Sequence, residues 1–89
     1  MGITETDSAL ANQLNVYPNP TSGEVNIDFG MEFDLKSVQL FNVNGQLVNT
    51  IATSTVTSAI NFELTEEPGV YFLTIAAGDE TRTVRLIKQ

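Results

Sequence analysis

The sequence contains no cysteine and no histidine. Without cysteine the chain has no disulfide, no thiolate metal site and no cysteine nucleophile, and it lacks the usual sequence indicator of redox compartment. Without histidine it lacks the commonest general base and the commonest protein ligand of zinc. Both absences disfavour enzyme mechanisms, and we predict no catalytic residue, no metal ion and no cofactor.

Positive charge is also scarce, because 4 Lys and Arg stand against 11 Asp and Glu and give a formal net charge of −7. A surface of that sign repels phosphate, so no nucleic-acid partner is expected. Most of the few cations fall within the last eight positions, as Arg82, Arg85 and Lys88. We interpret this basic end either as an edge strand protected by charge or as a recognition signal.

Long apolar runs are missing as well. The chain has 89 residues, 42% of them hydrophobic and 17% charged, which is typical of one folded domain without stable membrane insertion. No apolar secretory signal follows the N-terminus, so the chain is expected to be either cytoplasmic or a piece of a longer exported protein. Residues 1–13 are polar and without periodicity, which predicts a flexible leader or linker before a domain at residues 14–89.

From Leu14 onward, apolar and polar residues alternate with a period of two, and no window of ten residues shows a helical stripe. About seven short strands separated by turn residues are typical of an antiparallel β-sandwich. We therefore predict an all-β, immunoglobulin-like sandwich with Greek-key connections. The expected core consists of the in-phase apolar positions, which are Val16, Val25, Ile27, Leu40, Phe62, Tyr71, Leu73, Ile75, Val84 and Leu86.

A stiff corner follows the first of these strands, in the stretch "YPNP". Pro18 and Pro20 fix φ and lack an N–H, so no strand ladder can run through this point, and Tyr17 and Asn19 before them are held extended. Gly23 is expected to take a positive φ that lets the chain reverse into the next strand. The corner thus ends one strand and directs the next.

Three further turns are predicted. The dipeptide Asn44-Gly45 lies between two β-rich runs and is typical of a tight hairpin, and Gly78-Asp79 predicts another. Gly69 follows Pro68 at the start of an apolar strand. We expect Gly69 to have a positive φ, or to be packed too closely for a side chain.

Few residues suggest chemistry. The acidic pairs Glu66-Glu67 and Asp79-Glu80 fall in predicted turns, where adjacent carboxylates are usually solvated rather than catalytic. Ser22-Gly23 lacks the flanks of a nucleophile elbow and a histidine to activate the serine. Tyr17, Tyr71 and the phenylalanines could stack on sugars, but most lie on the alternating apolar face and are expected in the core.

The motifs together resemble the type A C-terminal sorting domain of the type IX secretion system of Gram-negative bacteria. The corner, the hairpin, the Pro-Gly strand and the final "TVRLIKQ" occur in that family's order over residues 14–89. One departure is the hairpin, which lacks the Arg that often follows the family's glycine. The matching motif residues are Tyr17, Pro18, Asn19, Pro20, Gly23, Asn44, Gly45, Pro68, Gly69, Tyr71, Leu73 and Ile75.

This resemblance implies a non-catalytic sorting signal. A fused N-terminal cargo would cross the periplasm and then reach the cell surface or the extracellular space through an outer-membrane translocon. The partners implied are this translocon, a shuttle protein and a sortase that removes the domain. We expect the recognised signal to be the final strand, which consists of Val84, Arg85, Leu86, Ile87 and Lys88.

A binding sandwich of a secreted protein, such as a carbohydrate-binding or fibronectin-like adhesion module, stays open as an alternative. Sandwich folds host many functions, so the fold alone cannot separate the two hypotheses. Their difference lies in position, because a sorting domain must end its parent chain, whereas a binding module can lie anywhere in it.

Overall fold

The computed structural model describes residues 14–89, which form only β-strands and their connections. The strands are β1 (Asn15–Tyr17), β2 (Glu24–Asn42), β3 (Leu47–Glu63), β4 (Gly69–Ala77) and β5 (Glu80–Lys88). Within this range there is no helix with the length and apolar character needed to cross a membrane. The leader predicted for residues 1–13 lies outside the described residues.

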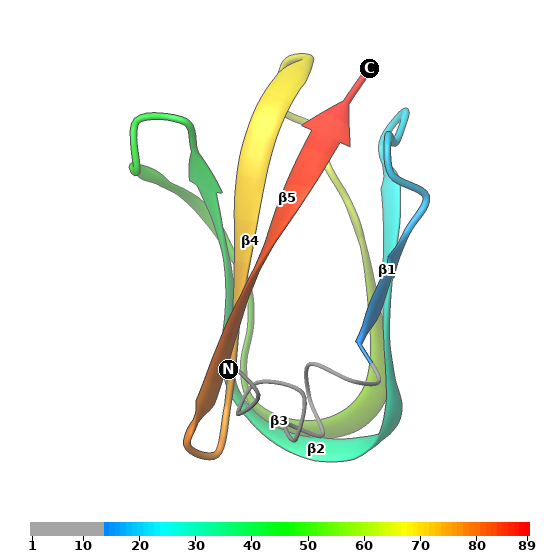
Figure 1. The fold of residues 1–89 in the computed structure, drawn as a ribbon, viewed down its shortest axis with the longest axis vertical. Helices are drawn as coiled ribbons and strands as arrows, with labels where there is room; N and C mark the ends of the chain where they lie inside the picture. Colours follow the sequence, from blue (N-terminus) through cyan, green and yellow to red (C-terminus); the bar gives the residue numbers. More distant parts are fainter. Residues whose placement is uncertain (1–13) are drawn as a thin grey trace, which may run out of the picture.

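The long strands β2 and β3 form one antiparallel ribbon that curls into a U (Figure 1). Along its other edge, β2 pairs first with β1 and then with β4, and β5 continues beyond β4. One side of the U is therefore a three-stranded arm of β1, the start of β2 and the end of β3. The other side is a four-stranded arm of β4, β5 and the remaining parts of β2 and β3.

The bend between the arms comes from extra residues in β2. Asp28 pairs with Ala59 and Phe33 with Thr57, so β2 advances five residues while β3 advances two. A bulge of this kind bends the bulged strand and increases its twist. Gly30 has a φ of 81° in this segment, and its N–H donates to the Asp28 carboxylate at 2.9 Å.

The all-β, antiparallel prediction is confirmed, but the architecture differs from a seven-stranded immunoglobulin-like Greek-key sandwich. The described residues form five strands in a single curled sheet. The higher count arose because each arm's part of β2 and of β3 has its own alternating run in the sequence. The strands β2 and β3 stay paired on both sides of each irregularity. Two runs expected as separate strands are therefore one continuous strand in β2, and the same holds for β3.

The core lies between the arms. Its fully buried apolar residues are Val25, Ile27, Phe29, Leu35, Val38, Leu40, Leu64, Leu73, Ile75, Ala77 and Leu86. The prediction of burial is confirmed for Val25, Ile27, Leu40, Leu73, Ile75 and Leu86. Four other expected core residues, Val16, Phe62, Tyr71 and Val84, are only partly buried and pack against this core. Leu35 was not anticipated because it lies just beyond the bend, where the alternation is broken.

Tyr71 remains partly exposed because its hydroxyl reaches the backbone. That hydroxyl donates to the Glu67 carbonyl oxygen at 2.6 Å. Burial, and then the carboxylates of Glu66 and Glu67, raise the pKa of Tyr71 above its ordinary value of 10.0. The phenol is therefore protonated at neutral pH and serves as a donor at the entrance to β4.

The hairpin between β2 and β3 is confirmed, with a left-handed conformation at Gly45 alone. The Gly45 N–H donates to the Asn42 carbonyl at 3.0 Å, and the Asn42 N–H donates to the Gln46 carbonyl at 3.0 Å. The Asn42 side-chain oxygen also accepts from the N–H groups of Asn44 and Gln46, at 2.9 and 3.0 Å. This is a three-residue loop closed by a left-handed glycine, and Asn42 organises it.

The predicted positive φ is confirmed at Gly69, where φ is 156°, and no atom lies within 4 Å of the position that a Cβ would occupy. The requirement at Gly69 is therefore conformational rather than steric. Gly23 has the same φ, and there a Cβ would collide with the Glu63 carboxylate. The Gly78-Asp79 hairpin is also confirmed, with a φ of 59° at Gly78.

Candidate functional site

The predicted recognition strand is part of β5, which pairs with β4 along its full length. Leu86 is fully buried and Val84 partly buried, so both side chains face the core. Arg85 is exposed and Ile87 partly buried on the opposite, outer face. The expected alternation is therefore present, and Arg85 presents its charge to solvent.

Lys88 is placed differently from Arg85. Its ammonium donates to the Glu66 carbonyl oxygen at 2.6 Å in a part-buried position. By the alternation of a strand, its side chain shares the face of Leu86 and lies opposite that of Arg85. The two cations that the sequence placed together near the end of the chain thus point to different sides of the sheet, with Lys88 tied to the fold.

The corner at residues 17–23 lies against the outer edge of β5. The Asn19 side-chain amide donates to the Arg85 carbonyl at 2.8 Å, and its oxygen accepts from the Ile87 N–H at 3.0 Å. A side-chain amide carries the same donor and acceptor as a peptide group. At Asn19 the side chain therefore takes the place that a backbone donor and acceptor have in a strand pair.

Thr21 continues the same contact with its backbone. Its N–H donates to the Ile87 carbonyl at 2.8 Å, and its carbonyl accepts from the Gln89 N–H at 2.9 Å. Its hydroxyl accepts from the Gly23 N–H at 2.9 Å, and the Thr21 side chain is fully buried. We call these contacts of Asn19 and Thr21 with β5 the corner clamp.

The corner, the Asn44-Gly45 hairpin, the start of β4 and the end of β5 lie at one end of the domain, opposite the bend (Figure 1). Asn42 at the hairpin pairs with Tyr71, and Tyr71 pairs with Leu86. The backbone of Lys88 in turn forms an isolated parallel β-bridge with Thr21 of the corner. Sequence reasoning did not single out Asn42 and Thr21, although both are small polar residues beside a turn, where such side chains commonly bond to the backbone.

Replacing Asn19 with alanine is expected to lower the free energy of unfolding by about 1 to 2 kcal/mol, because two hydrogen bonds to β5 are lost. Urea denaturation followed by circular dichroism measures this change. Asn19→Asp keeps the acceptor for the Ile87 N–H but lacks the donor to the Arg85 carbonyl. Its free energy of unfolding should therefore fall by less than that of Asn19→Ala. Asn49→Ala, at an exposed β3 position, is the control, and equal stability of the two alanine variants would contradict the clamp.

Residues 15–89 match the family model described as the secretion system C-terminal sorting domain. The chain belongs to this family. The match spans all five strands of the sorting domain, including the corner, the hairpin and the terminal strand. No curated protein and no solved structure gives a significant match.

The sorting domain is the C-terminal signal for type IX secretion, and its removal by cleavage is consistent with the family. It implies a type IX secretion system and a fused N-terminal cargo, and a protein exported to the cell surface or the extracellular space. A sorting signal is not itself catalytic. Among residues 14–89, no group of acidic side chains is arranged to hold a metal ion.

Proposed function

We propose that the secretion machinery recognises this domain through its terminal strand, at Val84, Arg85, Leu86, Ile87 and Lys88. The supporting observation is the corner clamp, which holds the backbone of this strand from Arg85 to Gln89. The sequence motifs converge on the same end of the domain. Both edges of this part of the strand are occupied, by the corner and by β4, so the strand presents one defined outer face to a partner.

The proposed partners are the outer-membrane translocon, a shuttle protein and a sortase. The cargo crosses the outer membrane, the sortase removes the domain, and the cargo is released or joined to a surface lipopolysaccharide. The domain catalyses no step, binds no nucleic acid and does not insert stably into a membrane. Its net charge of −7 supports the exclusion of nucleic acid.

The test is a reporter protein with an N-terminal export signal and this chain at its C-terminus, expressed in a host with a type IX secretion system. The expected result is reporter outside the cells, and reporter retained in the periplasm when the translocon is deleted. Retention in the intact host, or export that does not depend on the translocon, would overturn the proposal.

The double variant Arg85→Ala/Lys88→Ala is expected to weaken export while the domain stays folded. Arg85 is exposed, so its removal costs little stability, whereas removal of Lys88 also loses the bond to the Glu66 carbonyl. The single Arg85→Ala variant separates these effects and serves as the matched comparison. Export is measured by cell fractionation, and folding by circular dichroism.

If the folded double variant is exported at the wild-type rate, the two basic side chains take no part in recognition. Recognition would then lie elsewhere on the domain.

A further inference from the structure

Four side chains form one transverse row on the outer face of the four-stranded arm. Phe41 pairs with Leu47 on one side and with Phe72 on the other, and Phe72 pairs with Arg85. Residues directly opposite each other in paired antiparallel strands project from the same face. The row therefore crosses β3, β2, β4 and β5, and ends at the exposed cation of the proposed recognition strand.

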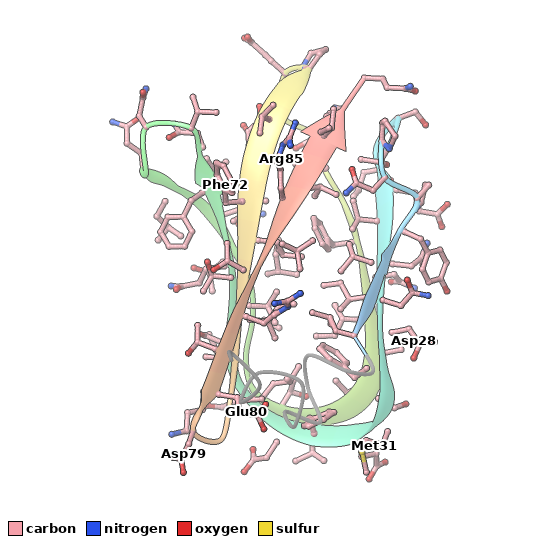
Figure 2. All side chains as sticks on the ribbon, viewed as in Figure 1. Asp28, Met31, Phe72, Asp79, Glu80 and Arg85 are labelled. Atoms are coloured by element: carbon pink, nitrogen blue, oxygen red, sulfur yellow. The ribbon has the colours of Figure 1, made fainter. Side chains whose placement is uncertain are left out.

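This row belongs to an apolar surface at the end of the arm opposite the bend, where Figure 2 labels Phe72 and Arg85. Val70 and Ile87 form the adjacent pair on the same face. We define the outer apolar patch as Phe41, Leu47, Val70, Phe72 and Ile87, with Arg85 as its charged member. Leu47 is 52% exposed, and the other apolar members are only partly buried.

The apolar character stops at the next row toward the bend. There Gln39 pairs with Thr74, and Thr74 with Thr83. The hydroxyls of the two threonines lie 3.4 Å apart. On the four-stranded arm, the outer apolar patch is therefore bounded toward the bend by a polar row. Contiguous apolar surface on a soluble domain marks an interaction site more often than scattered exposed residues do.

We infer that the outer apolar patch is part of the surface by which a protein of the export machinery holds this domain. This inference rests on the proposed function and extends it from the terminal strand to β2, β3 and β4. The partner presents an apolar surface with a carboxylate opposite Arg85, because Arg85 is the only charged member of the patch. Aromatic residues, phenylalanine included, and arginine are enriched in protein–protein interfaces relative to the rest of the surface.

The decisive variant is Phe72→Thr in the reporter fusion. Threonine already occupies the next outer position on β4, at Thr74, so the substitution suits the strand. Export is expected to fall at least about fivefold, as for a decisive interface residue. The matched control is Thr83→Ala on the polar row of the same face, with export expected within about twofold of wild type.

Leu47→Thr keeps the experiment informative if Phe72→Thr weakens folding, because Leu47 is the most exposed apolar member of the patch. Each variant's unfolding is followed by urea denaturation of the 89-residue chain. Arg85→Glu is expected to reduce export more than Arg85→Gln, since it places two carboxylates together. Equal export of these two variants would refute the carboxylate on the partner.

The failure of this inference is distinct from the failure of the proposed function. If the wild-type reporter is exported and the folded Phe72→Thr and Leu47→Thr variants are exported equally well, the patch is not a docking surface and the terminal strand stands alone. A wild-type dimer that Phe72→Thr dissociates in sedimentation equilibrium would instead assign the patch to a second copy of this chain.

Discussion

Deletion of residues 84–89 is expected to reduce export of a fused reporter to the level of a reporter without the sorting domain. The deletion removes the proposed recognition residues together with every β5 group that Asn19 and Thr21 contact. It also removes the buried Leu86 side chain and the bond from Lys88 to the Glu66 carbonyl. Cell fractionation should place the truncated reporter in the periplasm.

Unfolding is the main alternative explanation for that result, and Ile75→Ala separates the two. Ile75 is a fully buried residue of β4, so this substitution keeps all of residues 84–89 and the corner clamp, but costs about 2 to 5 kcal/mol of stability as a large-to-small change in the core. If Ile75→Ala is exported as poorly as the deletion, folding rather than recognition limits export. Substantial export of Ile75→Ala, with none for the deletion, supports recognition of the strand.

Replacing Phe29 with alanine is expected to lower the free energy of unfolding by about 3 to 5 kcal/mol. Phe29 is 0% exposed and is the largest of the fully buried side chains. It lies where β2 enters the bend, and its ring meets that of Phe33 edge to face, with centroids 6.1 Å apart. The total free energy of unfolding of a small domain is about 5 to 15 kcal/mol, so this loss removes much of its stability.

Chemical denaturation of the 89-residue chain measures the effect of Phe29→Ala. Val56→Ala is the control, because Val56 lies on β3 near the same bend but is 63% exposed, and its loss should be under about 0.5 kcal/mol. A loss below about 1 kcal/mol for Phe29→Ala would show that the two arms are not packed around this ring.

Local patterns in the sequence were sufficient to predict where the apolar strands and the turns lie. The alternation of Val25, Ile27 and Phe29 predicts both the strand and its buried face, and the positive φ of Gly69 follows from its place after a proline. The number of strands could not be predicted from the sequence. The strand β2 continues through the bulge at Gly30 because it pairs with β3 on both sides of it. Nothing local to β2 specifies that partner.

The corner clamp could not be predicted from the sequence either, because it too depends on a contact between distant parts of the chain. Asn19 and Arg85 are 66 residues apart, and a bond from a side-chain amide to a backbone carbonyl leaves no periodic pattern. The prolines show where a ladder must stop, but not which strand lies beside the corner. The same holds for Lys88, whose acceptor is a backbone carbonyl and not a charged side chain that composition would reveal.

The two ends of the described chain lie at opposite ends of the domain (Figure 1). Asn15 pairs with Asp28 beside the bend, whereas Gln89 is bonded to Thr21 at the corner. A pull between a cargo joined before β1 and a partner on β5 would therefore run along the strands. Antiparallel ladder bonds lie across that direction, so they are loaded in shear and share the force instead of opening one after another. The sorting domain is therefore arranged to transmit tension between the cargo and the partner along its length.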